Sequence, residues 1–286
     1  TKMKKIVIIG ANGMLGTDFS SIAKEEGFTV DKFDLPDSDI RNEKDVKLAV
    51  KNADIVANFA AYTNVDMAES EKEICWQINA EAPAILAKEC SIKNKFLLHT
   101  STDFVFGDIS SLPLKENDKT NPLNFYGKSK LEGEKNILKF HPNSLIVRLE
   151  WTYGNKKQNF ITKIIDKAKN QKKIKVVADQ YGSPTWTIDA SYAMIDLLKK
   201  RTNGIFHYAA DGYVNRFELA KFVINFLKIP VEIEPCSSTD IKTPAKRPLN
   251  SRFDCSKIDS ILSFKRPKWN LSLKKYLSDL KHRDKI

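Results

Sequence analysis

Short apolar runs alternate with amphipathic segments through the first half of the chain. The runs show no clean in-and-out alternation, which predicts strands that are buried on both faces of a parallel sheet. Because strands and helices alternate, we expect an α/β fold with a Rossmann-type, doubly wound parallel sheet. The predicted strands span residues 5–9, 29–33, 55–59, 96–100 and 144–149, and the predicted helices span residues 14–26, 43–51, 71–91 and 126–139.

The regularity weakens in the second half of the chain, after about residue 149. Helices are predicted over 159–169, 188–200 and 216–227, and a strand over 204–209 would extend the first sheet. Segments rich in Pro, Ser and Thr, such as 235–248, are typical of loops. We therefore expect a dinucleotide-binding Rossmann domain over 1–150, together with 204–212, and a smaller C-terminal lobe over 151–286 that mainly binds substrate.

The balance of residue types is that of an ordinary globular protein, because 42% of the 286 residues are hydrophobic and 29% are charged. The net charge of +11 raises the question of nucleic-acid binding. However, the lysines are scattered, and no basic helix, zinc finger or RNP-like aromatic strand accompanies them. A solvated surface that attracts anionic small molecules is the better interpretation, and we expect no nucleic-acid partner.

No apolar run approaches the roughly 20 residues that a membrane-spanning helix needs. The apolar run near residue 6 is too short for the core of a signal peptide, so we expect a cytoplasmic protein without membrane association. The cysteines include no closely spaced pair, which indicates reduced thiols rather than disulfides or a zinc site, and we expect no metal ion. These cysteines are Cys75, Cys90, Cys236 and Cys255.

A glycine-rich loop follows the first predicted strand and opens the first predicted helix. Gly10, Gly13 and Gly16 have the spacing G-x-x-G-x-x-G. Glycine lets the backbone turn sharply and approach a pyrophosphate, and the helix N-terminus offers free N–H groups to its oxygens. A glycine triple can also be a merely structural turn, but this context favours nucleotide binding. The loop contacts that we expect with the cofactor also include Asn12, Met14 and Leu15.

An acidic residue, Asp34, ends the second predicted strand, 18 residues after Gly16. Such a residue accepts hydrogen bonds from the adenosine ribose and repels a 2′-phosphate, and no arginine lies beside it in the sequence. We therefore expect NADH or NADPH as cofactor, with NADH favoured, unless Asp34 is only a solvated loop residue. Further cofactor contacts are expected from Asp39, Ile40, Ala60, Ala61, Tyr62, Tyr126 and Lys130.

Two further motifs fall where this geometry would place catalytic groups. Thr102 directly follows the predicted strand 96–100 within Ser-Thr-Asp, and Tyr126 and Lys130 form a Y-x-x-x-K motif at the start of a helix. Residues four apart share a helix face, so both side chains point into one site. A nearby lysine cation favours the phenolate, so Tyr126 can exchange a proton with a substrate oxygen while hydride moves. Thr102 would polarise the same carbonyl. Taken alone, Y-x-x-x-K is also compatible with an exposed tyrosine and a solvated lysine.

These motifs, in this order, resemble the dTDP-4-dehydrorhamnose reductase family of extended short-chain dehydrogenases. The resemblance covers nearly the whole chain. Beyond the glycine loop and Y-x-x-x-K, it includes residues 60–70, 101–106, 121–124, 179–185 and 247–251. It implies reduction of the 4-keto group of a nucleotide-diphosphate deoxysugar, most simply dTDP-4-dehydro-L-rhamnose to dTDP-L-rhamnose, for surface polysaccharide.

The resemblance also implies roles for single residues. It makes Thr102, Tyr126 and Lys130 the catalytic set and places substrate contacts at Thr102, Asp103, Trp151, Arg247 and Asn250. Arg247 and Asn250 would lie near the substrate diphosphate, where a guanidinium fork is suitable. The alternative roles are core packing for Trp151 and a surface ion pair for Arg247.

Two positions separate the chain from related patterns. Sugar-nucleotide 4,6-dehydratases are similar but carry a glutamate where this chain has Phe104, which cannot take a proton, so reduction is favoured over dehydration. Glu150, before Trp151, replaces the small residue more familiar in the family, which leaves the exact sugar open.

Two alternatives remain. One is another nucleotide-sugar reductase or an epimerase on the same scaffold. The other is a non-catalytic regulatory subunit like that of methionine adenosyltransferase, which the intact Thr102, Tyr126 and Lys130 disfavour. Sheet-flanking helices often pair, so a homodimer is consistent with the predicted fold.

Overall fold

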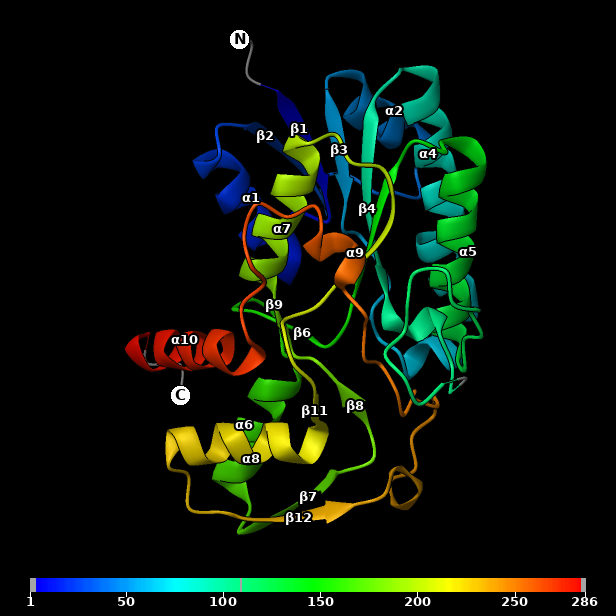
Figure 1. Cartoon of the computed structure of the whole chain (residues 1–286). Coiled ribbons are helices and arrows are strands. Elements are labelled where there is room, and N and C mark those ends of the chain that lie inside the picture. The colour runs from blue at the N-terminus through cyan, green and yellow to red at the C-terminus, as the bar shows by residue number, and fades with distance from the viewer. Residues whose placement is uncertain (1–3, 109, 284–286) are drawn as a thin grey trace.

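A parallel six-stranded sheet forms the centre of the molecule (Figure 1). The computed structural model describes residues 4–108 and 110–283. The strand order is β10-β5-β4-β3-β1-β2. The chain adds β2 on one side of β1 and then adds β3, β4, β5 and β10 on the other side. The topological switch point, where ligands of such sheets bind, therefore lies between β1 and β3. This topology confirms the predicted fold class. The strands are β1 (Lys5–Ile9), β2 (Thr29–Phe33), β3 (Ile55–Asn58), β4 (Phe96–Thr102), β5 (Leu145–Leu149) and β10 (Gly204–Tyr208).

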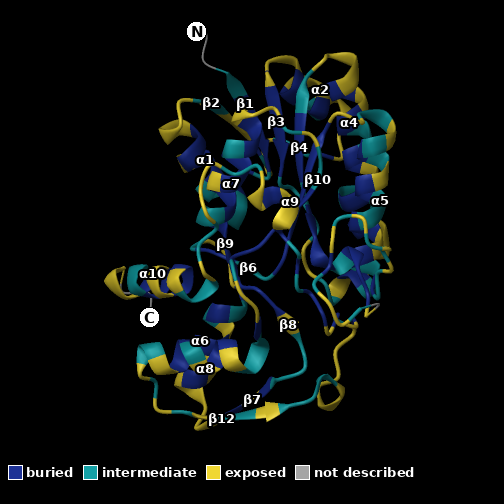
Figure 2. Cartoon of the chain, in the orientation of Figure 1, coloured by how far each residue is buried: buried dark blue, intermediate teal, exposed yellow. Residues whose placement is uncertain are grey.

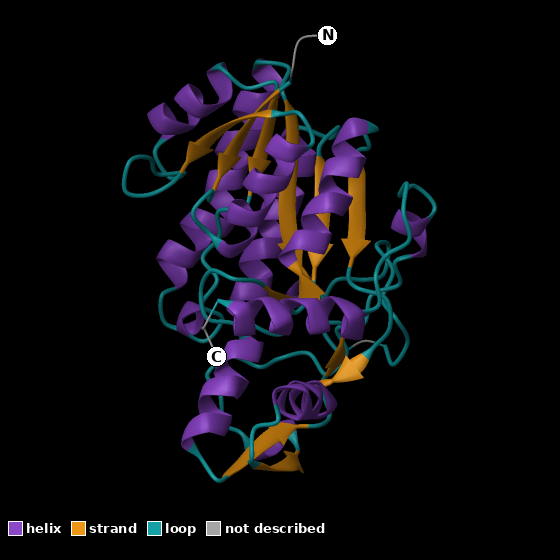
Figure 3. Cartoon of the chain, turned by 90° about the vertical axis from the view of Figure 1, so that its left-hand side faces the viewer, coloured by secondary structure: helices purple, strands orange, loops and turns teal. Residues whose placement is uncertain are grey.

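Helices cover both faces of this sheet, so its inner strands are buried on both sides, whereas most of the edge strand β2 is exposed or half-buried (Figures 2 and 3). The side chains of β1 divide between two cores, because successive residues of a strand point to opposite faces. Ile6 and Ile8 belong to the core with α1 and α7, and Val7 and Ile9 belong to the core with α2, α4 and α5. These helices are α1 (Met14–Glu25), α2 (Glu43–Lys51), α4 (Ala82–Ile92), α5 (Phe125–Phe140) and α7 (Thr187–Lys199).

The single helix that the sequence predicts over 71–91 is wrong in detail. The structure has α3 (Lys72–Trp76), a π-helical segment η2 (Gln77–Glu81) and then α4. The wider π turn carries Asn79, whose side chain bonds both the N–H and the carbonyl of Tyr62. It also donates to Ser129 Oγ on α5, at 3.0 Å. The tertiary hydrogen bonds of Asn79 therefore coincide with a break in a segment whose sequence pattern is helical throughout.

A smaller lobe lies beyond the carboxyl ends of the central strands (Figure 1). Its helices α6 (Phe160–Asn170), α8 (Arg216–Leu227) and α10 (Trp269–His282) pack with the parallel pair β7 (Lys173–Val177) and β12 (Glu232–Cys236). The sequence pattern missed α10, β7 and β12. Strand β12 takes the first two residues of the segment expected to be loop. Pro235 is tolerated there because β12 has a single hydrogen-bonded neighbour in its sheet.

Short pairings connect the sheet with the lobe. These are β6 (Thr152–Tyr153) with β9 (Thr185–Trp186), and β8 (Tyr181–Gly182) with β11 (Val214–Asn215). The remaining elements are α9 (Ser256–Asp259) and the 3-10 turns η1 (Met67–Glu69), η3 (Asp103–Val105) and η4 (Ser238–Asp240). Over the described part of the chain, no helix is long and apolar enough to cross a membrane.

Candidate active site

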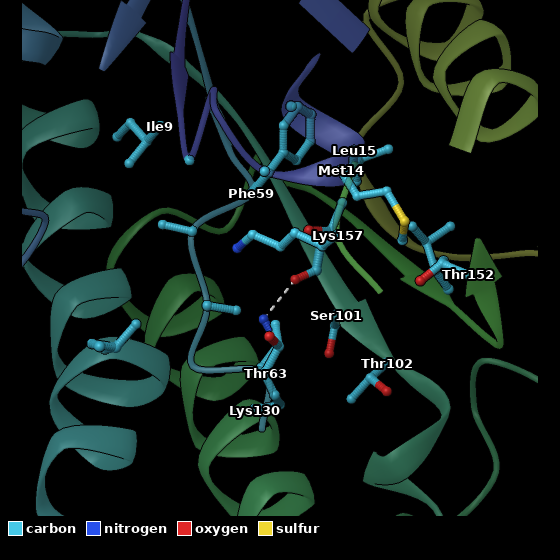
Figure 4. Close-up of a pocket in the computed structure, with 18 of the residues that line it drawn as sticks. Ile9, Met14, Leu15, Phe59, Thr63, Ser101, Thr102, Lys130, Thr152 and Lys157 are labelled. Carbon is cyan, nitrogen blue, oxygen red and sulfur yellow. Dashed lines mark hydrogen bonds between the residues drawn. The ribbon is translucent and has the colours of Figure 1, made fainter. Parts of the chain in front are cut away.

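A cavity of about 610 Å³ opens where the strands of the sheet end and the lobe begins. Met14 and Leu15 lie towards one end of it, and Ser101, Thr102 and Lys130 lie towards the other (Figure 4). The predicted site residues that line it are Gly10, Gly13, Met14, Leu15, Gly16, Asp34, Asp39, Ile40, Ala60, Ala61, Thr102, Asp103, Tyr126, Lys130 and Trp151. Those that do not line it are Asn12, Tyr62, Arg247 and Asn250.

The glycine loop is built so that side chains have no room at two of its positions. Gly10 has a φ of +78°, and a Cβ on it would lie 2.6 Å from the nitrogen of Ala60. A Cβ on Gly16 would lie 2.2 Å from the carbonyl oxygen of Gly10. Gly13 is the N-cap of α1 and supplies no side chain to its first N–H groups. This end of the cavity therefore fits a phosphate group, since N–H groups of the first helical turn remain available.

Asp34 orders this loop as well as lining the cavity. Its carboxylate accepts hydrogen bonds from the Asn12 N–H at 2.7 Å and from the Leu35 N–H at 2.8 Å. Asn12 thus contributes its backbone rather than its side chain. The carboxylate still has free lone pairs, so it remains able to accept from a ribose hydroxyl.

An arginine that the sequence argument overlooked lies in the same part of the cavity. Arg41 lines it together with Asp34 and Asp39, although no arginine lies beside Asp34 in the sequence. Its guanidinium reaches Asp39 with Nε at 3.0 Å and Nη2 at 2.5 Å. This hydrogen-bonded guanidinium lowers the pKa of the Asp39 carboxyl. The charge of Arg41 is therefore balanced by Asp39 at this end of the cavity.

The catalytic candidates gather where β4 meets α5. Thr102 Oγ1 donates to Asp103 Oδ1 at 3.0 Å and accepts from the Phe104 N–H at 3.2 Å, so its hydroxyl is held in place. Tyr126 stands in the first turn of α5, and the Phe104 ring packs edge-on against its ring with centroids 5.5 Å apart. Gly127 allows this closeness, because a Cβ there would lie 2.1 Å from the Phe104 carbonyl oxygen.

Lys130 lies one turn after Tyr126 and is buried. Its Nζ donates to the Thr100 carbonyl at 2.7 Å (Figure 4) and lies 3.4 Å from His99 Nε2. Burial lowers the pKa of Lys130 to about 8. Burial, and then the charge of Asp103, raises the pKa of Tyr126. The site therefore holds a protonated phenol and, one helical turn away, a lysine whose ammonium group is a stronger acid than usual, which suits proton donation to a substrate oxygen.

Two buried carboxyl groups stand on the lobe side of Thr102. Asp103 Oδ2 accepts from Ser251 Oγ at 2.5 Å, and Glu150 Oε2 accepts from the Ser183 N–H at 2.8 Å. Burial raises the pKa of Asp103, and burial together with Asp103 raises that of Glu150. Glu150 does not line the cavity; it fastens lobe segments behind it, and it accepts from the Phe253 N–H as well.

The cation facing these acids is Arg216, which the sequence argument also missed. It begins α8, lines the cavity, and places its guanidinium 3.5 Å from the centroid of the Trp151 ring. Trp151 has a φ of +46°, a strained value that is uncommon for a large side chain and that clusters at functional sites. Its place in the cavity lining and its contact with Trp151 are tertiary features, so the sequence around Arg216 does not mark it.

Arg247 and Asn250 serve to fasten loops. Arg247 forms a fork on Asp66 with both nitrogen–oxygen distances at 2.7 Å. Asn250 Nδ2 donates to the carbonyls of Ser110 and Leu112 at 2.9 and 2.8 Å. In this arrangement both side chains are engaged by the protein itself. Tyr62 is engaged in the same way, since its hydroxyl donates to Glu71.

Known proteins resemble this chain along nearly its whole length. A family model described as the RmlD substrate binding domain matches residues 3–282. The dTDP-4-dehydrorhamnose reductase of Mycolicibacterium smegmatis is 38% identical over 86% of this chain and 76% of its own length. That of Escherichia coli is 31% identical over 96% of this chain and 97% of its own length.

Solved structures agree with these relatives. The dTDP-4-dehydrorhamnose reductase of Clostridium acetobutylicum superposes with a TM-score of 0.93 at 33% identity, covering 97% of this chain and 99% of that one. The Bacillus anthracis enzyme, solved in complex with NADP, superposes with a TM-score of 0.93 at 30% identity and the same coverage, 97% and 99%.

Proposed function

Because the chain belongs to the dTDP-4-dehydrorhamnose reductase family, we propose that it reduces the 4-keto group of dTDP-4-dehydro-L-rhamnose to give dTDP-L-rhamnose. The observation that carries this proposal is the meeting of Thr102, Tyr126 and Lys130 with the glycine loop in a single cavity. The product would serve the synthesis of surface polysaccharide.

Different residues of the chain would carry out different parts of the reaction. A reduced nicotinamide supplies the hydride when it is bound. The Tyr126 phenol would donate a hydrogen bond to the substrate carbonyl and so polarise it, and the Thr102 hydroxyl would add a second one by turning its single hydrogen from Asp103 to the substrate. Tyr126 would then pass its proton to the developing alkoxide, which its raised pKa supports because the phenol is protonated beforehand. Lys130 would stabilise the phenolate that remains.

On the substrate side, we propose that Trp151 and Asp103 contact the sugar and that Arg216 faces the diphosphate. Arg216 is supported by its place in the cavity lining and by its stacking on Trp151. The diphosphate roles of Arg247 and Asn250 stay predictions, and their bonds to Asp66 and to the loop carbonyls weigh against them. Glu150 would act on the sugar only indirectly, through the segments that it fastens.

For the cofactor, we propose that the chain prefers NADH over NADPH and that Asp34 and Arg41 together determine this preference. A negative Asp34 would repel a 2′-phosphate, whereas Arg41 would attract one if it left Asp39. Asp34→Asn keeps an acceptor for the Asn12 N–H but removes the charge, so the NADH/NADPH ratio of kcat/KM should fall. Arg41→Ala should raise that ratio. Unchanged ratios in both variants would show that neither side chain reaches the ribose.

The decisive assay is the loss of reduced-nicotinamide absorbance with purified protein and enzymatically generated dTDP-4-dehydro-L-rhamnose. We expect rapid, substrate-dependent oxidation of NADH and slower oxidation of NADPH. No oxidation, with cofactor binding intact, would point to another keto sugar, to an epimerase or to a regulatory subunit. Four predictions from the sequence stay predictions. They are the Rossmann domain over 1–150 with 204–212, the lobe over 151–286, the homodimer and the cytoplasmic location. Light scattering tests the homodimer.

A further inference from the structure

A buried line of polar groups runs behind the catalytic lysine. Asn58 and His99 face each other on the neighbouring strands β3 and β4, and both are 0% exposed. The Ala60 N–H donates to Asn58 Oδ1 at 3.2 Å, and Asn58 Nδ2 lies 3.1 Å from His99 Nδ1. At the other end, His99 Nε2 lies 3.4 Å from Lys130 Nζ. The line thus connects the loop after β3, which lines the cavity, with the lysine.

Each contact in this line holds one hydrogen, and this determines where the ring proton of His99 lies. Because Asn58 Oδ1 accepts from the Ala60 N–H, the Asn58 amide nitrogen faces the imidazole, and an amide nitrogen only donates. Nδ1 of His99 is therefore the unprotonated ring nitrogen, and Nε2 carries the proton. That N–H is directed at Lys130, where a neutral amine can accept it and an ammonium group, which has no lone pair, cannot.

We propose that His99, oriented by Asn58, is a positioning residue that makes the Lys130 ammonium group give up its proton more readily, because the His99 Nε2–H can be accepted only by the amine. The proposal rests on the proposed function in so far as Lys130 serves Tyr126. After Tyr126 breaks its O–H bond to protonate the substrate oxygen, Lys130 would return a proton to the phenolate. The resulting amine would then accept the Nε2–H of His99, and solvent would later restore the lysine proton.

The charges around Lys130 are consistent with this role. Burial, and then the charge of Lys130, keeps the pKa of His99 well below its usual value, so the ring is neutral. Burial also raises the pKa of the Cys75 thiol, which leaves it uncharged, and Tyr126 is protonated. Glu134, one turn further along α5, is already engaged by the Arg148 guanidinium at 2.7 Å. Among the groups that the structure describes around Lys130, none is an unpaired anion that would hold the ammonium form.

The first test reads the tautomer of His99 directly and needs no turnover. The whole protein is labelled with ¹⁵N-histidine, and the His99 ring nitrogens are assigned by their loss in His99→Gln. We expect an unprotonated Nδ1 and a protonated Nε2 at neutral pH. A protonated Nδ1, or an imidazolium, would overturn the proposal. Because no substrate is present, this result is independent of whether the reductase assay succeeds.

The second test uses two substitutions of Asn58. Asn58→Leu removes the donor to Nδ1 without adding charge, and Asn58→Asp replaces the donor by an acceptor. Both should free Nε2 to accept from the ammonium group, so the alkaline fall of kcat should move to higher pH, by about one unit in Asn58→Asp. The KM for the nucleotide sugar should change little. If the alkaline fall of kcat stayed at the same pH in Asn58→Leu, the charges around Lys130 alone, and not the tautomer of His99, would determine the pKa of Lys130.

His207→Gln is the matched control. His207 is also 0% exposed and lies in the same sheet, but its Nε2 faces Arg148 at 3.3 Å rather than Lys130. Its substitution should leave the alkaline limb where it is. If Asn58→Leu does not fold, the near-isosteric Asn58→Asp decides alone: an unchanged tautomer and an unchanged limb in that variant would end the proposal.

Discussion

The two walls of the cavity are built in different ways. On the sheet wall, Thr102, Tyr126 and Lys130 are held by neighbours close in sequence or by the adjacent backbone, as in the bond from Thr102 to the next residue. On the lobe wall, contacts join distant segments: the Arg216 guanidinium at the start of α8 stacks on the Trp151 ring. On the proposed function, the chemistry would depend mainly on local geometry, whereas substrate selection would depend on how distant segments meet. We expect catalytic changes to be large and specific, and lobe changes to be graded.

The largest expected effect lies on the sheet wall. Tyr126→Phe removes the proton donor and keeps the ring that packs on Phe104, so kcat should fall about 10²–10⁴-fold. The Kd for NADH, measured by fluorescence, should stay within about twofold, because the change leaves the glycine loop untouched. A variant that turns over at the wild-type rate would remove Tyr126 from the mechanism.

The glycine loop should be nearly as sensitive. Gly10→Ala places a Cβ against the Ala60 backbone and should abolish measurable NADH binding, with a loss of stability of about 1–3 kcal/mol. Gly27→Ala is the matched control, because Gly27 also has a positive φ, +84°, but nothing lies within 4 Å of its Cβ position. It should lose stability and keep its cofactor affinity. Equal NADH affinities in the two variants would contradict the proposed phosphate site.

On the lobe wall, Arg216→Gln should raise the KM for the nucleotide sugar about 10–100-fold, the cost of one lost charged hydrogen bond. The NADH affinity should not change, since Arg216 lies at the Trp151 side of the cavity. Arg247→Gln is the comparison: it breaks the fork on Asp66, so it should lower stability more than it raises KM. If Arg247→Gln raised the KM more than Arg216→Gln did, the proposed contact with the diphosphate would belong to Arg247.

The smallest effect concerns Glu150. Its pKa is raised in the folded protein, so the folded state binds the proton more tightly than the unfolded state does. The free energy of unfolding should therefore fall as the pH rises above about 4.5, by up to about 1.4 kcal/mol per pH unit. Glu150→Gln should flatten this dependence in urea titrations at pH 5 and pH 8. Glu218→Gln, at an exposed position of α8, should leave the slope unchanged.

The sequence by itself determined the sheet wall. A G-x-x-G-x-x-G loop, a strand that ends at Thr102, and Tyr126 and Lys130 four residues apart are local patterns, and local patterns specify backbone conformation. The parallel sheet followed from short apolar strands that alternate with helices. Asp34 was recognisable because it stands at the end of the second strand.

Only the tertiary structure decided the rest, since contacts between distant segments leave no local signature. It interrupted the helix at η2 for the sake of Asn79, and it added β7, β12 and α10 to the lobe. It placed Arg216 over Trp151, although nothing in the sequence around Arg216 marks that arginine. It also set Asn58 and His99 side by side, because strands β3 and β4 pair in one particular register. The physical reason is the same throughout: burial and register bring together groups that the chain keeps apart.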